Sequence, residues 1–164
     1  MTAIEFIKVS LQNSAGWAMG LINDMKDAPL TQPTSSGGNH PLWVLGHIVR
    51  AESDLLDGFI LGKPNRFPEL ENCGMGHEPS TNADDYPPMD ELLGKFEEIR
   101  SATLAHLDTL SDDDLDQKSH APEEFGATFG TVGACFAAMG THMAFHTGQV
   151  ADARRAAGRK PLMA

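Results

Sequence analysis

Long runs of apolar residues are missing from this sequence of 164 residues. A membrane-spanning helix needs about 20 consecutive apolar residues, and no stretch approaches that length. The first six residues also lack the basic region, apolar run and cleavage site of a secretory signal. We therefore expect a cytoplasmic protein with no membrane partner.

Basic residues are scarce, since 12 Lys and Arg stand against 23 Asp and Glu, a formal net charge of −11. Nucleic acids carry a negative phosphate backbone, so a chain with this balance binds them only through a concentrated basic patch. The basic cluster at residues 154–160 lies at the expected end of a helix, where positive charge complements the helix dipole. We expect no nucleic-acid partner.

Cysteine is also rare, and the two present, Cys73 and Cys135, have neither zinc-site nor redox-motif spacing. Nothing else in the sequence indicates secretion, so we expect free thiols rather than a disulfide. Cys135 lies in an apolar helical stretch and is expected to pack as a small hydrophobic residue. Cys73 lies in a glycine-rich segment, which predicts an exposed loop position.

A period-two alternation of apolar and polar residues, typical of half-buried strands, is absent. Apolar residues instead recur every three or four positions along four segments, which predicts amphipathic helices. The length and the 41% hydrophobic content fit one globular domain, residues 1–164. We expect an all-α four-helix bundle. The expected helices span residues 3–27, 41–61, 88–110 and 131–157.

Three connections rich in proline, glycine and polar residues separate these helices: residues 31–40, 65–88 and 116–130. The second is long for a connection inside a compact domain, and such segments often serve as a lid or a wall of a site. Because long connections permit several packing orders, the pattern predicts long crossovers without predicting the topology.

Two of the seven histidines, His142 and His146, stand one helical turn apart on the apolar stripe of the last helix. This spacing places their Cβ atoms about 6 Å apart on one inward face, as in the helical HExxH zinc motif. Spacing alone leaves open both a metal site and a hydrogen-bonded structural pair. Residue 143 is Met rather than the glutamate base of HExxH proteases, so that chemistry is excluded.

His47, in the second expected helix, is the candidate third ligand, with the small Ala51 one turn away. Metal sites in bundle cores are built from facing helices, and three protein ligands with open positions are typical of catalytic sites. The other four histidines are expected to be solvated or structural, with His40 or its neighbour Asn39 as a helix cap. These four are His40, His77, His106 and His120.

Short motifs in this order resemble the DinB-like (YfiT-like) metalloenzyme superfamily. Residues 39–47, NHPLWVLGH, resemble the start of that family's second helix, where the histidine of an LGH element binds metal. Residues 129–158 resemble its fourth helix, with an HxxxH pair, a following GQ and an RRALG-like end. Residues 86–93 and the acidic turn 111–116 resemble the entry and exit of its third helix, so the resemblance covers nearly the whole chain.

The resemblance implies a four-helix bundle, often a homodimer, that holds a nickel or zinc ion on His47, His142 and His146. Histidine ligands also suit Fe, Cu and Mn, so the metal stays open. Characterised relatives include transferases and an isomerase that depend on low-molecular-weight thiols such as mycothiol or bacillithiol. The resemblance therefore implies a metal-dependent transferase or hydrolase acting on a small-molecule substrate, with a low-molecular-weight thiol as the candidate cofactor. A non-catalytic metal-binding or stress-related bundle, or an interaction module, are the alternatives.

Side chains near the triad suggest further roles. Asp54 lies seven residues after His47 on the same helical face, and is a candidate for orienting a ligand or handling a proton. The alternative for Asp54 is an ion pair with Arg50. Trp43 could wall the pocket or belong to the core. The arginines at 154–155 could bind a cofactor carboxylate, or simply complement the helix end.

Overall fold

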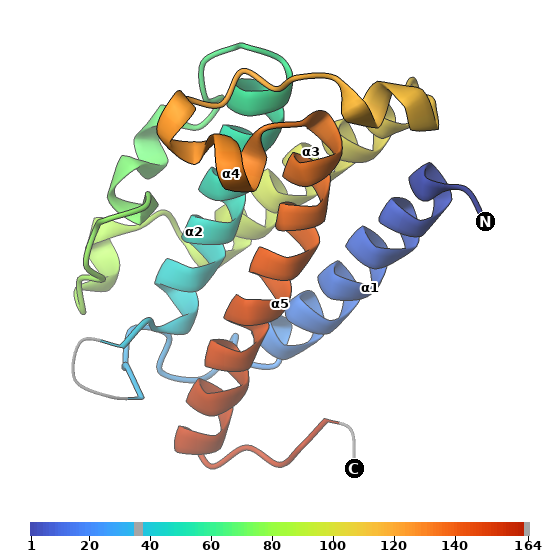
Figure 1. Ribbon diagram of the computed structural model, residues 1–164. Helices are drawn as coiled ribbons and strands as arrows, with labels where there is room; N and C mark the ends of the chain where they lie inside the picture. The colour runs from blue at the N-terminus through green and yellow to red at the C-terminus, as the bar shows by residue number, and fades with distance from the viewer. Residues whose placement is uncertain (35–37, 163–164) are drawn as a thin grey trace.

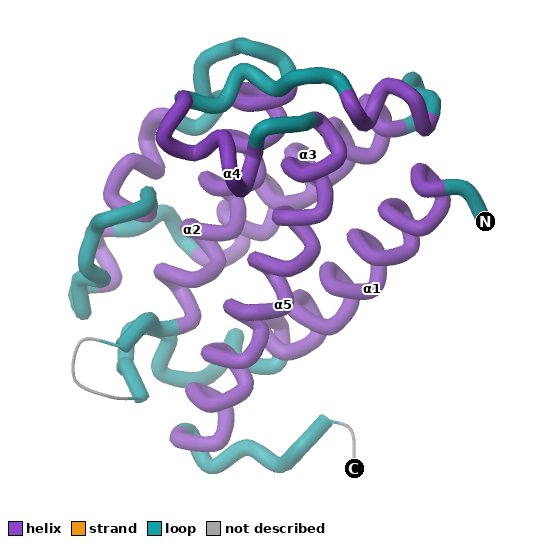
Figure 2. Tube along the Cα trace, viewed as in Figure 1, coloured by secondary structure: helices purple, strands orange, loops and turns teal. Residues whose placement is uncertain are grey.

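The computed structural model describes residues 1–34 and 38–162, and these ranges form a bundle of helices without a strand (Figures 1 and 2). The expected all-α four-helix bundle is confirmed. Part of the expected connection 31–40, residues 35–37, lies outside the described residues. The long helices are α1 (Ala3–Asn23), α2 (Pro41–Ser53), α3 (Met89–Leu107) and α5 (Val132–Ala156), and a short α4 (Gly126–Phe129) precedes α5.

The beginnings of the helices follow local sequence chemistry. Thr2 and Glu5 form a capping box, in which the Thr2 hydroxyl accepts from the Glu5 amide and the Glu5 carboxylate accepts from the Thr2 amide. Pro41 occupies the first turn of α2, where its missing N–H costs nothing. His40 is the N-cap of α2, because its Nδ1 accepts from the Trp43 amide at 3.1 Å.

The second helix continues beyond α2 as a π-helical segment, Asp54–Ile60, so its expected extent to residue 61 is nearly right. The wider turn shows in the bond from the Leu61 amide to the Leu56 carbonyl, five residues back. Within this segment the buried Asp57 carboxylate accepts from the Ser53 hydroxyl and from Arg66. This change of helical type was not predicted by the apolar spacing.

The long connections contain more structure than their composition predicts. Residues 65–88 include 3-10 turns at Pro68–Cys73 and Ala83–Asp85, and residues 116–130 include Glu123–Phe125 and α4. The expected exposed position of Cys73 is wrong, since this residue is fully buried. The physical reason is Gly46 on α2, where a Cβ would lie only 2.6 Å from the Cys73 Sγ. The missing side chain at position 46 therefore makes room for the cysteine.

The core lies between the long helices, with α1 beside α5 (Figure 1) and α2 packed against both α3 and α5. Cys73 and Cys135 are both buried and unpaired, as expected for free thiols. Among the described residues, no helix combines the length and the apolarity needed to cross a bilayer.

Candidate metal centre

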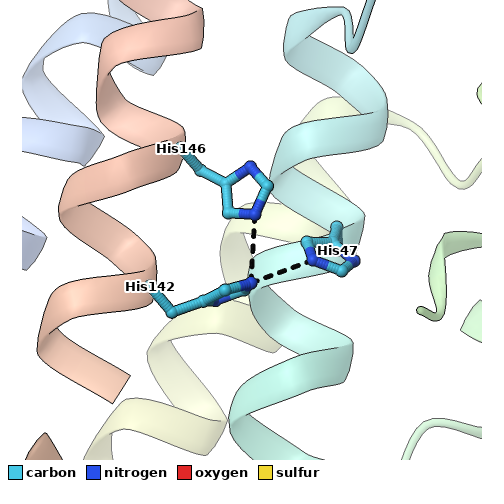
Figure 3. A group of neighbouring side chains, drawn as sticks. All are labelled: His47, His142 and His146. Carbon is cyan, nitrogen blue, oxygen red and sulfur yellow. Dashed lines mark hydrogen bonds between the residues drawn. The ribbon is translucent and has the colours of Figure 1, made fainter. Parts of the chain in front are cut away.

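Three histidines from two helices meet in the core of the bundle (Figure 3). His47 projects from α2, and His142 and His146 project from consecutive turns of α5. The Nε2 atom of His142 lies 3.0 Å from Nε2 of His47 and 3.0 Å from Nε2 of His146. One nitrogen from each ring thus lies within 4.8 Å of the other two.

The Nδ1 atoms of His47 and His146, which are the ring nitrogens away from the centre, lie within hydrogen-bond distance of other groups of the protein. Nδ1 of His47 lies 2.6 Å from the Cys73 carbonyl oxygen, to which it must donate. Nδ1 of His146 lies 2.7 Å from Oε1 of Gln149, an oxygen that also accepts from the Asn39 amide. A neutral imidazole carries one proton, so both rings present an unprotonated Nε2 to the centre.

This arrangement of lone pairs fits a cation. A hydrogen on Nε2 of His142 can form a full hydrogen bond with only one of the two neighbouring Nε2 atoms. A metal ion, in contrast, can accept a lone pair from all three nitrogens. Nitrogen ligands about 2.0–2.1 Å from zinc are themselves about 3.0–3.4 Å apart, which the two observed contacts match. Ligand histidines typically donate their second N–H to a carbonyl or carboxamide, as His47 and His146 do here.

The surroundings keep these rings neutral. Burial, reinforced by the neighbouring imidazoles, lowers the pKa of His142 to about 3. Burial likewise lowers the pKa of His146 to about 4, although the hydrogen bond that His146 donates to Gln149 acts in the opposite direction. Burial also lowers the pKa of His47, although Cys73 and Asp54 act in the opposite direction. At neutral pH the three rings are therefore uncharged, and each has one nitrogen lone pair that it can donate to a metal.

The walls of the triad are mostly apolar. The Trp43 indole stacks on His47 with ring centroids 4.5 Å apart, so this buried side chain is both core and site wall. The Phe145 ring packs edge-on against the His146 ring, with ring centroids 5.2 Å apart. His142 and the buried Glu52 both line a cavity of about 10 Å³, room for about one water molecule.

Asp54 forms an ion pair with Arg50, which was the alternative to a role beside the triad. Its carboxylate accepts from Arg50 at 3.3 Å and from the Asn65 amide at 2.7 Å. None of its hydrogen bonds in the described part of the chain reaches the triad, so its influence on His47 is electrostatic. A role of Asp54 in orienting a ligand or moving a proton stays a prediction.

The arginines at the end of α5 have carboxylate partners within the chain. Arg154 is buried and binds Asp24 at 2.7 Å, and Arg155 binds Asp152 at 2.8 Å. These pairs favour the helix-end interpretation over recognition of a cofactor. The first pair also joins the end of α1 to the end of α5.

The four other histidines lie outside the triad, as expected. His40 is fully buried and structural, since its Nε2 lies 2.7 Å from the Ser80 carbonyl while Nδ1 caps α2. His106 is partly buried near Phe136, and His77 and His120 are exposed.

Sequence reasoning missed the groups that orient two rings of the triad. Gln149 carried a signal, because it stands three residues after His146 on the same stripe and within the GQ element. Asn39, which fixes the Gln149 amide, lies 110 residues away and carried none. The Cys73 carbonyl is a backbone group, so no side-chain pattern could indicate it. Residues 65–88 do form part of the site wall through this carbonyl.

Comparison with known proteins agrees with this geometry. No curated protein matches the chain. The family model of the DinB superfamily matches residues 17–150, which include the three histidines and more than three quarters of the sequence. The expected resemblance is therefore confirmed, and the chain belongs to the DinB superfamily.

Proposed function

We propose that this protein binds one divalent metal ion through His47, His142 and His146, and uses it in a transfer or hydrolysis reaction on a small molecule. The observation that carries the proposal is the convergence of three Nε2 atoms, two of them with their outer nitrogens already bonded elsewhere. Membership of the DinB superfamily supports it. A low-molecular-weight thiol is our candidate nucleophile.

When bound, the ion acts as a Lewis acid that lowers the pKa of a thiol or a water molecule. Three neutral ligands suit this task, because they leave the positive charge of the ion uncompensated. The chain supplies the orientation of two ligands through Cys73 and Gln149, and Trp43 excludes water from one side of His47. His142 is the one residue of the three that is only partly buried, so we propose that the substrate approaches on its side.

A non-catalytic metal-binding protein is the second candidate, and the burial of the ligands favours it. His47 and His146 are only 9% and 5% exposed. An enclosed ion would mainly join α2 to α5, much as structural zinc sites stabilise small folds.

The first experiment is metal analysis by mass spectrometry on tag-free protein, with His146→Ala and the exposed His77→Ala as matched variants. We expect one equivalent of nickel or zinc per chain, lost in His146→Ala and kept in His77→Ala. Because both variants remove one imidazole, this pair separates the triad from adventitious binding by surface histidines. Absence of metal from wild-type protein after reconstitution with nickel and zinc would refute the proposal.

A second experiment separates the catalytic from the structural role. Cobalt(II) is substituted into the site, and a small thiol is then titrated while the near-ultraviolet and visible spectrum is recorded. A new sulfur-to-cobalt charge-transfer band means that the ion has an open position, as the catalytic proposal requires. An unchanged spectrum, together with a large rise in Tm on metal binding, supports the structural candidate instead.

A further inference from the structure

One ring of the triad differs from the other two in the bonding of its Nδ1 atom. Nδ1 of His47 lies 2.6 Å, and Nδ1 of His146 2.7 Å, from an acceptor oxygen of the protein. Within the described residues, both hydrogen bonds of the His142 ring are at Nε2, so its Nδ1 has none there. In the same part of the chain, Nε of Arg100 is the one fully buried side-chain nitrogen or oxygen without a partner. Nδ1 of His142 is therefore not sealed off by protein atoms, and a water molecule can reach it.

The chemistry of a ligand ring requires an acceptor for this nitrogen. A neutral imidazole that gives the lone pair of Nε2 to a metal carries its hydrogen on Nδ1. In metal sites that N–H almost always donates to a carboxylate, a carbonyl or a water, and the bond fixes the orientation of the ring. Figure 3 shows Nε2 of His142 directed at the other two rings, so the acceptor for Nδ1 must lie elsewhere around this ring.

A small cavity brings a carboxylate to the same side chain. Its lining consists of His142, Glu52 and four apolar side chains: Ile48, Leu55, Met139 and Met143. The volume of about 10 Å³ is room for about one water molecule. A water held inside a protein needs at least two polar partners, and the imidazole and the carboxylate are the polar side chains of this lining. The cavity therefore suits one water that accepts from His142 and donates to Glu52.

The Glu52 carboxylate is held in place and has acceptor capacity to spare. Its Oε2 accepts from Arg100 and its Oε1 accepts from Thr103, each at 2.7 Å. A carboxylate has about four acceptor positions, so these two bonds leave others open. The Glu52 side chain is only 3% exposed, so bulk solvent does not satisfy the remaining positions. A water in the cavity gives this buried carboxylate a further donor.

The pairing of Glu52 with Arg100 also suits the charge of the site. A lone carboxylate near the ligands would offset part of the charge of a bound ion and weaken it as a Lewis acid. Glu52 and Arg100 together are neutral, as are the Cys73 carbonyl and the Gln149 amide that accept from the other two rings. An acceptor of this kind orients His142 without placing a net negative charge beside the ion.

We propose that Glu52 is the positioning residue of His142 and acts on it through one water molecule in this cavity. The inference rests on the proposed function, because it assigns to Glu52 a role toward a bound metal ion. This role is additional to the contacts by which Glu52 joins α2 to α3.

The first test needs no variant. Nuclear magnetic resonance of zinc-loaded, ¹⁵N-labelled protein detects the imidazole N–H protons, which give a signal when a hydrogen bond slows their exchange with bulk water. We expect an Nδ1–H signal from each of the three ligands, His47, His142 and His146. A His142 signal lost to exchange at neutral pH, while the other two remain, overturns the proposal.

The second test compares two variants of the Glu52 network. Glu52→Leu with Arg100→Met removes the carboxylate without leaving a buried charge unpaired. Thr103→Val is the matched control, because it removes a hydrogen bond to Glu52 and keeps the carboxylate. In competition with a chelator, the double variant should bind zinc about 10–100-fold more weakly, and Thr103→Val within about threefold of wild type. The Nδ1–H signal of His142 should be lost in the double variant alone.

Urea unfolding of both variants separates a structural role of Glu52 from positioning. With a purely structural role, zinc affinity falls in step with stability in both variants and the His142 signal persists, which overturns the proposal. A double variant that binds zinc as tightly as wild type also overturns it, while the wild-type spectrum remains a test even if that variant does not fold. Wild-type protein that binds no zinc or nickel refutes the metal site itself, and with it this inference. A wild type that binds metal, with an indifferent double variant, refutes only the role of Glu52.

Discussion

Removing Glu52 tests the electrostatics of the core beside the triad. The Glu52 carboxylate accepts from Arg100 at 2.7 Å and from the Thr103 hydroxyl at 2.7 Å, joining α2 to α3. The two charged side chains are only 3% and 8% exposed. Arg100 also donates to the Leu11 carbonyl of α1, while its Nε has no partner among the described residues.

Glu52→Ala leaves the Arg100 charge buried without its counter-ion. Breaking a buried pair in this way costs about 3–5 kcal/mol, a large part of the about 5–15 kcal/mol by which such domains are stable. Glu52→Gln keeps the shape and should cost about 1–3 kcal/mol, because a neutral amide replaces a charged acceptor. Replacing both residues, as in Glu52→Leu with Arg100→Met, should recover most of the loss, since no charge then remains unpaired.

The assay is urea unfolding followed by circular dichroism, with Asp90→Ala as the matched control. Asp90 pairs with Lys26, but its side chain is 86% exposed, so its loss should change the free energy of unfolding little. The reasoning is refuted if Glu52→Ala is no less stable than Asp90→Ala, or if the double variant is less stable than Glu52→Ala alone.

Three further predictions concern the ligand supports and a buried carboxylate. Gly46→Ala should lower the free energy of unfolding by about 1–3 kcal/mol, because the added Cβ crowds Cys73, and it should weaken metal binding. The control Gly94→Ala has open space around it and should raise the Tm slightly in thermal unfolding. Gln149→Leu should lower metal affinity about 10–100-fold in competition with a chelator, and Gln149→Glu should retain it, because only the latter keeps an acceptor for the ring nitrogen of the neighbouring histidine ligand. Burial alone would raise the pKa of Asp57, but hydrogen bonds from the neighbouring arginine and serine outweigh it and lower that pKa. The stability that Asp57 contributes is therefore present above its unfolded-state pKa and lost as the pH falls through the lower folded-state value. Asp57→Asn should be less stable than wild type at pH 7, and the difference should shrink in urea titrations at progressively more acidic pH, whereas a constant difference would contradict this account.

Local chemistry in the sequence was enough to predict the helices and the pair of histidines that α5 contributes to the site. Apolar spacing, the Pro41 start and the glycine after α5 depend on residues within a few turns of each other, so they can be identified without a structure. The same holds for His142 and His146, because the helical repeat alone places positions four apart on one face. The all-α class and the inward direction of this pair were therefore decided by the sequence itself.

The rest of the site depends on packing between segments far apart in the chain. His47 was a candidate from its LGH setting, but only the packing of α2 against α5 brings its ring to 3.0 Å from His142, 95 residues away. The burial of Cys73 depends on the space above Gly46, and the backbone carbonyl of Cys73 orients the ring of His47. Contacts of this kind are decided by how apolar faces fit together, which only the tertiary structure determines.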